Sequence, residues 1–297
     1  MIVYLPIKLF KMLSIDPKEI SIKKLHSYLL GAIAPRPIAF ASTVDVDGNP
    51  NLSPFSFFNV FGANPPILIF SPARRVKNNT TKHTLDNAIA TKQVVINVVN
   101  YGIVQQMSLS SSEYPEGVNE FEKAGFTMLP SDKIQPYRVA ESPVQFECKV
   151  NDVIFTGENA GAGNLIICEV LKIHISDQVL AEDGSIDQYK IDLVARAGGS
   201  FYTRAREGFF EIPKPITTLG IGVDALPMEV RNSQVLTGNN LGLLGNIAQL
   251  PTQDAVNNFG KEHPKFIGLE TTKKHTFVQE YLKNNDVESA WKVLLLN

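Results

Sequence analysis

Cysteine is scarce in this chain, which holds only Cys148 and Cys168 among its 297 residues. Their wide separation matches neither a disulfide framework nor the spacing of a zinc site. Each cysteine lies in an apolar run, so we expect two buried and unreactive thiols. A chain without disulfides is typical of a reducing compartment, and we therefore expect a cytoplasmic protein.

A surplus of one charge sign is also missing, because 28 Lys and Arg face 30 Asp and Glu, a formal net charge of −2. We expect no extended basic face for nucleic acid, although a few local cations can hold a small anion. No stretch approaches the about 18–20 apolar residues of a membrane helix. The apolar opening stretch 1–13 contains Lys8 and Lys11 and has no small-residue cleavage site, so we expect no signal peptide. Met12 is an alternative start of translation.

Several patterns that carry chemistry are absent. The histidines, at positions 26, 83, 174, 263 and 275, show no metal-ligand spacing, and no Gly-x-Ser-x-Gly elbow occurs. The sequence therefore predicts neither a metal site nor a serine hydrolase, and we expect His174 to be a half-exposed strand residue. The glycine-rich stretch 157–163 precedes a strand pattern, whereas a dinucleotide-binding loop precedes a helix. We expect a hairpin loop there.

Strand patterns fill much of the first 206 residues. Extended runs rich in β-branched and aromatic side chains cover 37–44, 51–60, 67–70, 93–99, 144–155 and 165–176. Asp47-Gly48 and Asp183-Gly184 are hairpin signals, and strands and helices do not alternate regularly. The pattern indicates an antiparallel barrel or sandwich. Pro54 predicts that its run lies at a sheet edge or contains a bulge.

Helical patterns flank these strands. One amphipathic helix is predicted over 21–30, a helix start at 80–84, and a helical region over 252–296 that includes the only tryptophan, Trp291. The character of the chain changes at Pro213-Lys214-Pro215. We therefore predict a β domain over residues 14–215 and a C-terminal extension of loops and helices over 216–297.

Residues 35–87 gather the groups that a phosphorylated aromatic ligand requires. A phosphate binds at a helix N-terminus, a cation and hydroxyl groups, which Lys82, Thr84, Ser42 and Thr43 supply in this sequence. A flat heteroaromatic ring requires an apolar wall with a few hydrogen-bonding groups, and the run Ser53–Phe57 offers both. A bulged edge at this run would free N–H groups for the ligand.

The same region carries motifs that form a recognisable set. They are Arg36-Pro37-Ile38, Asn51-Leu52-Ser53-Pro54-Phe55-Ser56-Phe57-Phe58, Pro65-Pro66, Lys82-x-Thr84-x-x-Asn87, Asp183-Gly184-x-x-Asp187 and Ala195-Arg196-x-Gly198-Gly199-x-x-Tyr202. Together they resemble the flavin reductase-like family with the FMN-binding split barrel, over roughly residues 25–210. Two departures are His83, where the family usually has aspartate, and the lack of a late His-x-Leu motif.

The resemblance implies a mainly β, α+β fold: an antiparallel, six-stranded Greek-key split β-barrel with flanking helices, here followed by the helical C-terminal extension. It also implies a homodimer, with FMN near the subunit interface and NADH or NADPH as hydride donor. Carried over to this chain, the flavin-binding residues are Ser42, Thr43, Asn51, Ser53, Pro54, Phe55, Ser56, Phe57, Ser71, Lys82 and Thr84. Lys82 and Thr84 would contact the phosphate.

These implications predict an NAD(P)H-dependent flavin reductase that moves a hydride through flavin N5. No catalytic residue is assigned, because the cofactor carries this chemistry and the protein binds and orients it. An alternative is a flavoredoxin-like electron carrier with tightly bound FMN and no direct turnover of NAD(P)H. A split-barrel module that has lost its ligand is a third possibility.

Overall fold

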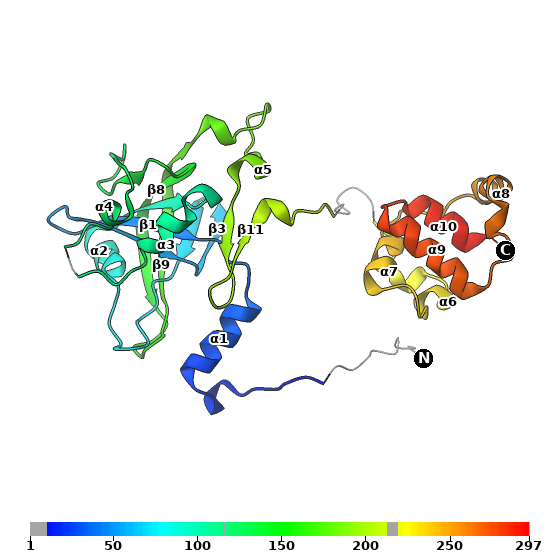
Figure 1. Cartoon of the computed structure of the whole chain (residues 1–297), viewed down its shortest axis with the longest axis horizontal. Coiled ribbons are helices and arrows are strands. Elements are labelled where there is room, and N and C mark those ends of the chain that lie inside the picture. The colour runs from blue at the N-terminus through cyan, green and yellow to red at the C-terminus, as the bar shows by residue number, and fades with distance from the viewer. Residues whose placement is uncertain (1–10, 116, 213–218, 297) are drawn as a thin grey trace. The chain divides into compact units, whose positions relative to one another are not determined.

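A computed structural model describes residues 11–115, 117–212 and 219–296. The chain divides into two compact units, one formed by residues 14–210 and a second that holds the described residues from 211 on. In Figure 1 the first unit is coloured from blue to yellow-green and the second from yellow to red. The boundary predicted at 213–215 lies outside the described residues and stays a prediction.

The first unit is built on an antiparallel sheet of seven strands in the order β2-β1-β5-β8-β9-β4-β3. These strands are β1 (Ala39–Val44), β2 (Pro50–Phe55), β3 (Phe58–Ala63), β4 (Pro66–Phe70), β5 (Gln93–Val98), β8 (Val144–Phe155) and β9 (Asn164–Ile175). Two small ribbons pair β6 (Met128–Leu129) with β7 (Arg138–Val139) and β10 (Val194–Arg196) with β11 (Tyr202–Arg204). The predicted antiparallel, mainly β architecture is confirmed.

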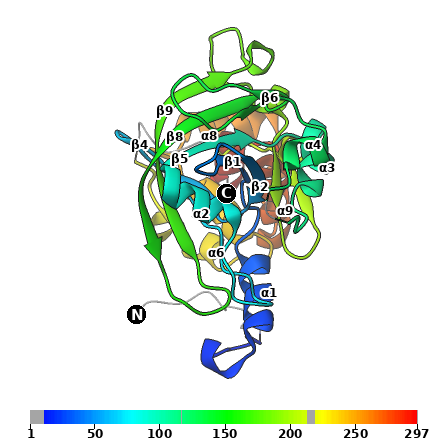
Figure 2. The same ribbon diagram turned by 90° about the vertical axis from the view of Figure 1, so that its left-hand side faces the viewer.

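The sheet has one strand more than the six predicted, because the run 51–60 forms two strands instead of one. β2 and β3 lie at opposite edges of the sheet, although only Ser56 and Phe57 separate them in the chain. The three residue steps from Phe55 to Phe58 span at most about 11 Å, so the sheet must curl until its two edges approach each other. Figure 2 shows β9, β8, β5, β1 and β2 following one another around this curve. Pro54 is at an edge, as predicted.

Local sequence explains the hairpins. In the β1–β2 turn, the carboxylate of Asp45 accepts hydrogen bonds from the N–H groups of Asp47 and Asn49 at 2.9 and 2.8 Å. Gly48 has φ of +86°, a conformation that glycine adopts without strain. The glycine-rich stretch 157–163 joins β8 to β9, which confirms the predicted hairpin loop.

Helices cover the sheet on several sides. In the first unit they are α1 (Ile22–Ala32), α2 (His83–Thr91), α3 (Val104–Leu109), α4 (Glu120–Ala124) and α5 (Gln188–Ile191), with 3₁₀ turns η1 (Pro17–Glu19), η2 (Tyr101–Ile103), η3 (Asp177–Val179) and η4 (Ala205–Glu207). α2 contacts β1, β2, β5, β8 and β9, and its Leu85 and Ala88 are buried among their side chains. α3 and α4 lie against β2. The edge of β2 therefore lies between two sets of helices.

The second unit is helical. It contains η5 (Val223–Ala225), α6 (Met228–Arg231), α7 (Gly238–Gly245), α8 (Gln253–Glu262), η6 (Pro264–Phe266), α9 (Thr271–Lys283) and α10 (Val287–Leu295). Trp291 is buried in its core, and its indole N–H donates to the carbonyl of Leu244 at 3.0 Å. Across residues 11–115, 117–212 and 219–296, no helix has the length and apolar character needed to cross a membrane.

A core substitution in the second unit should destabilise that unit measurably. Replacing the fully buried Leu244 by Ala leaves a cavity beside Trp291, and we expect a loss of about 2–5 kcal/mol in the free energy of unfolding. Trp291 fluorescence during urea unfolding reports on this unit alone, because the chain has one tryptophan. Leu250→Ala, at an exposed site, is the matched control and should change stability little. Equal effects of the two variants would contradict this core assignment.

Candidate functional site

Three cavities follow one another past the edge of β2. We name them the anion cavity, of about 30 Å³ and including Asn51, Ser53 and Lys82; the edge cavity, of about 140 Å³ around Pro54; and the tyrosine cavity, of about 310 Å³ around Tyr202. Ser111 lines both the anion and the edge cavities, and Tyr202 lines both the edge and the tyrosine cavities. The three cavities are therefore neighbours, and together they form one candidate binding region.

Two cations and a helix N-terminus meet at the anion cavity. Lys82 is the N-cap residue of α2, and the first helical hydrogen bond runs from the Leu85 N–H to the Lys82 carbonyl at 2.9 Å. The N–H groups of His83 and Thr84 precede that bond, so they lie where a helix favours an anion. Burial, reinforced by nearby Arg75, lowers the pKa of Lys82. Partial burial of two cations is costly unless an anion accompanies them.

A carboxylate from a neighbouring loop accompanies these cations. Arg75 donates to the Thr80 hydroxyl at 2.9 Å and to the Thr81 carbonyl, which fixes its guanidinium at the cavity. Its Nε lies 3.3 Å from Oε1 of Glu113, in the loop after α3. The charge of Glu113 also opposes the lowering of the Lys82 pKa. The exposed Glu113 side chain thus lies where an anionic ligand would bind.

A buried network lies beneath the anion cavity. Glu120 is 5% exposed and accepts hydrogen bonds from Asn51 Nδ2 and the Leu52 N–H, both at 3.0 Å. Asn51 Oδ1 in turn accepts from the Thr84 hydroxyl at 2.8 Å. Burial raises the pKa of Glu120, although the Leu52 N–H opposes this effect. The network holds β2, α2 and α4 together and fixes the floor of the cavity.

Two arginines place positive charge beside the edge cavity. Arg36 is 6% exposed, and its guanidinium donates to the carbonyls of Leu30 and Ala197 at 2.8 and 3.1 Å, to the Ile33 carbonyl, and to the Ser56 hydroxyl at 3.4 Å. Burial and the neighbouring Arg196 lower the pKa of Arg36. Among the described residues, neither arginine forms an ion pair with a carboxylate. The edge cavity therefore has a positive potential.

The structure brings seven of the eleven predicted site residues to these cavities. Asn51, Ser53, Lys82 and Thr84 line the anion cavity, and Pro54, Phe55 and Ser56 line the edge cavity. Phe55 and Ser56, predicted to contact the ring, thus lie near Lys82 and Thr84, predicted to contact the phosphate.

The other four predicted site residues do not line these three cavities. Ser42 and Thr43 are buried on opposite faces of β1, and Thr43 accepts a hydrogen bond from Asn87 at 3.1 Å. Ser71 is buried, and its hydroxyl accepts from the Asn164 N–H at 3.0 Å. Phe57 is partly exposed near His26. A role for these four in ligand binding stays a prediction.

The residues missed at the sequence level come from distant segments. Arg75 and Glu113 lie in loops, Glu120 lies in α4, and Arg196 and Tyr202 lie in the β10–β11 ribbon. Arg36, Arg196 and Tyr202 stand in the motifs quoted above, so a signal for them exists in the sequence. Nothing in the local pattern around Glu113 or Glu120 distinguishes these residues from solvated acids.

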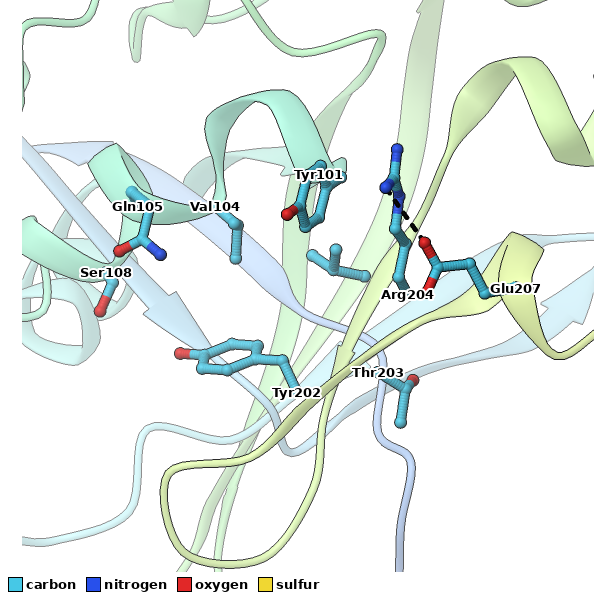
Figure 3. A pocket seen from close by; sticks show the side chains of 9 residues that line it. Tyr101, Val104, Gln105, Ser108, Tyr202, Thr203, Arg204 and Glu207 are labelled. Atoms are coloured by element: carbon cyan, nitrogen blue, oxygen red, sulfur yellow. Dashed lines mark hydrogen bonds and ion pairs between the residues drawn. The ribbon is translucent and has the colours of Figure 1, made fainter.

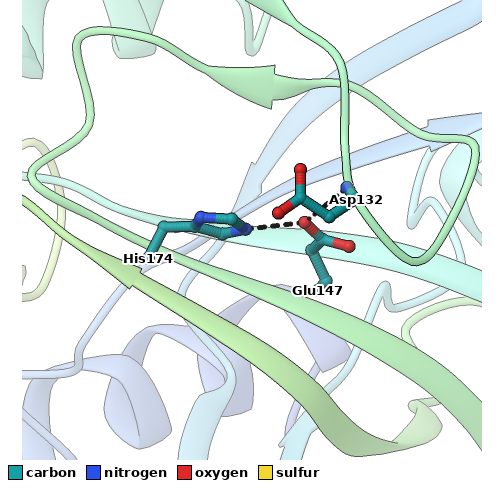
Figure 4. A group of neighbouring side chains, drawn as sticks. All are labelled: Asp132, Glu147 and His174. Atoms are coloured by element: carbon teal, nitrogen blue, oxygen red, sulfur yellow. Dashed lines mark hydrogen bonds and ion pairs between the residues drawn. The ribbon is translucent and has the colours of Figure 1, made fainter.

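A second polar cluster lies away from the cavities, on β8, β9 and the loop after β6 (Figure 4). Glu147 is fully buried and accepts from the N–H groups of Asp132 and Lys133 at 2.9 and 2.7 Å, and His174 Nε2 lies 2.6 Å from it. Lys172 pairs with Asp132. The carboxylate oxygens already have partners, so the cluster acts as a clamp that holds the loop on the sheet. His174 is partly buried on its strand, as expected.

Both cysteines are buried and unpaired, as predicted. Burial raises the pKa of the Cys148 and Cys168 thiols, which keeps them protonated and poorly nucleophilic at neutral pH.

Comparisons with known proteins place the chain beside flavin-related proteins. Residues 31–191 match the family model of the flavin reductase like domain. The chain is 37% identical over 188 residues to a protein of Aquifex aeolicus (strain VF5), which covers 63% of this chain and 93% of that one. It is similar to the crystal structure of nitrilotriacetate monooxygenase component B from Bacillus cereus, with 29% identity, a TM-score of 0.63, and coverage of 69% of this chain and 99% of that chain. A Pseudomonas fluorescens 2-nitrobenzoate 2-nitroreductase shares the fold, with 24% identity, a TM-score of 0.62, and coverage of 71% and 100%.

The Glu147 clamp predicts a dependence of stability on pH. Burial alone would raise the pKa of Glu147, but hydrogen bonds from the Asp132 and Lys133 N–H groups and from His174 lower it overall. A lowered pKa in the folded state stabilises the protein above the ordinary carboxyl pKa, and this contribution is lost as the pH falls through the folded value.

Glu147→Gln should therefore lose about 1–3 kcal/mol at pH 7 and much less at acidic pH, as measured by urea unfolding at a series of pH values. Glu182→Gln, at an exposed turn, is the control. A Glu147→Gln deficit that stays constant down to pH 3 would contradict the clamp.

Proposed function

Because this chain belongs to the family of the flavin reductase like domain, we propose that it is an oxidoreductase that binds FMN along β2 and accepts hydride from NADH or NADPH. Family membership confirms the resemblance carried by the motifs. The split barrel is the fold of the solved relatives and agrees with the curled seven-stranded sheet.

The observation that carries the proposal is that two cations, Arg75 and Lys82, line the anion cavity at the start of α2, next to the edge cavity. A phosphate monoester would neutralise both cations and accept from the free N–H groups of the first helical turn. Ser53 lines the anion cavity and precedes Pro54 of the edge cavity along β2, so one ligand can reach both cavities. The anion cavity is small, at about 30 Å³, so a phosphate bound there would displace the exposed Glu113 side chain.

The edge cavity suits one end of the ring system, because its volume of about 140 Å³ holds about one aromatic ring and the rest of the flavin would lie at its open mouth. Ile38, Phe55 and Met107 supply apolar surface, and Ser56 supplies a hydroxyl. FMN would supply two-electron chemistry here, because its ring accepts a hydride. Arg36 and Arg196 stabilise negative charge at this edge, which favours the reduced state of a bound flavin. The residues of this chain bind and orient the cofactor, and we assign no proton transfer to them.

A homodimer is the second part of the proposal. β3 is an edge strand with exposed apolar side chains, Val60 and Phe61, and β9 exposes Leu171, Ile173 and Ile175. Exposed apolar side chains on an edge strand favour pairing with another chain.

The proposal also includes a cytoplasmic location, because a reduced nicotinamide nucleotide is a cytoplasmic metabolite.

The phosphate assignment predicts opposite effects of two substitutions. Lys82→Ala removes a charge-assisted hydrogen bond and should weaken FMN binding about 10–100-fold. Glu113→Gln removes the carboxylate that competes for Arg75 and should tighten FMN binding several-fold. The dissociation constants come from flavin fluorescence titration. Riboflavin, which lacks the phosphate, is the control ligand, and neither variant should change its affinity. An unchanged FMN affinity in Lys82→Ala would refute the phosphate assignment.

Anaerobic absorption spectra separate the enzyme from the carrier. We expect FMN bound to the protein to lose its yellow colour, the visible absorption of oxidised flavin, within seconds of NADH or NADPH addition. A yellow protein inert to both nucleotides, yet reduced by dithionite, would instead support the flavoredoxin-like carrier. A colourless protein that takes up no added FMN would support a module without ligand.

The dimer assignment is tested at the β3 edge. Phe61 is 65% exposed in one chain, and Phe61→Glu places a charge on this apolar surface. We expect the dissociation constant of the variant dimer to be about 10–100-fold higher than that of the wild type. Val46→Glu, in the exposed β1–β2 turn, is the matched control. Sedimentation velocity measures the populations. A wild-type protein that is monomeric at micromolar concentration would contradict the dimer.

A further inference from the structure

The tyrosine cavity is the largest of the three, at about 310 Å³, and the flavin proposal does not use it. η2 and α3 form one side of it, and the β10–β11 ribbon and η4 form the other. Figure 3 shows the rings of Tyr101 and Tyr202 on opposite sides of the cavity, with Gln105 and Ser108 at one end and Arg204 and Glu207 at the other.

The walls of this cavity suit an aromatic ligand. Tyr101 is 52% exposed and Tyr202 is 38% exposed, although Arg204 lies 3.9 Å from the Tyr101 ring and Arg196 lies 4.5 Å from the Tyr202 ring, each over one ring face. The opposite faces are the ones a ligand would stack on. Val104 and Val194 add apolar surface between them. An apolar cavity of about 150 Å³ accommodates benzene. A cavity of twice that volume accommodates two fused rings, which can stack on either tyrosine.

The charges at the cavity are already compensated. Arg204 donates to both carboxylate oxygens of Asp192 at 2.8 and 2.7 Å and to Glu207 at 3.1 Å. One face of its guanidinium is covered by the Tyr101 ring, 3.9 Å away. Arg206 also pairs with Asp192 at 3.2 Å. A charged ligand would lose water here without gaining an unpaired counter-ion from the residues that line the cavity, so the cavity favours an uncharged one.

Neutral hydrogen-bonding groups lie at the end opposite Arg204. The side chains of Gln105 and Ser108 are exposed on α3 and border the cavity. An amide and a hydroxyl donate to carbonyl oxygens, which completes a site for a planar ring that carries carbonyl groups at its edge.

We propose that the tyrosine cavity binds an uncharged, planar two-ring carbonyl compound of the quinone class. Tyr202 lines both this cavity and the edge cavity, so a ligand bound here lies beside a ligand bound there. The role of the compound as a redox partner rests on the proposed function, whereas its binding does not.

The test uses isothermal titration calorimetry of the whole chain, without flavin, with 1,4-naphthoquinone as the probe. Gln105→Trp fills the cavity from an exposed position and should weaken binding at least about tenfold. Gln178→Trp, at an exposed position in η3 outside the cavity, should bind as the wild type does. The anionic 1,4-naphthoquinone-2-sulfonate should bind at least about tenfold more weakly than the uncharged probe.

Three results would overturn the proposal: equal binding by wild type and Gln105→Trp, equal or tighter binding of the sulfonate, or competition between naphthoquinone and FMN for one site. A protein that binds naphthoquinone as expected but takes up no FMN would overturn the proposed function and leave this site standing. A protein that binds FMN but no naphthoquinone would overturn this site alone.

Discussion

The short Ser56-Phe57 link between two edge strands is the constraint on which the candidate site depends. Because β2 and β3 lie at opposite edges of one sheet, this link is possible only if the sheet curls until those edges approach each other. Among the described strands, β2 pairs with β1 alone, so its other side is free of a ladder. The anion and edge cavities are lined by residues of this strand and its end, and α2, α3 and α4 close them from either side.

Electrostatics follows from the same arrangement. The start of α2 lies at one end of the β2 edge with Arg75 and Lys82, and Arg36 and Arg196 lie at the other end. A chain with a net charge of −2 therefore concentrates four cations along one short strand, with Glu113 as the exposed acid among them. A field of this kind favours a ligand that is anionic at one end and becomes electron-rich at the other. The charge-compensated tyrosine cavity beyond Tyr202 favours a different, uncharged molecule.

Much of the fold could be predicted from local sequence. The β1–β2 hairpin follows from Asp47-Gly48, the long β8–β9 hairpin from its two apolar runs, and the start of α2 from 80–84. The split of 51–60 could not, because no glycine or hairpin signal interrupts this extended run and only long-range pairing assigns β3 to the far edge. The residues predicted to bind a phosphate and a flat ring cluster in one segment of the sequence. That clustering was sufficient to find seven residues that line the anion and edge cavities.

The remaining residues near the site were beyond local reasoning. Neighbouring residues of a strand face opposite sides, so Ser42 and Thr43 lie on opposite faces of β1, and their role in ligand binding stays a prediction. Glu113 and Glu120, by contrast, are ordinary acids in their own segments. They acquire a role only because the fold brings them to Arg75 and Asn51.

A crystal structure of the protein with FMN would show whether its phosphate binds at the start of α2. We expect a phosphate within hydrogen-bonding distance of Lys82 Nζ and the first N–H groups of α2, with Glu113 displaced and the ring beside Ser56. A phosphate bound anywhere else, with the Arg75–Glu113 pair intact, would contradict this expectation.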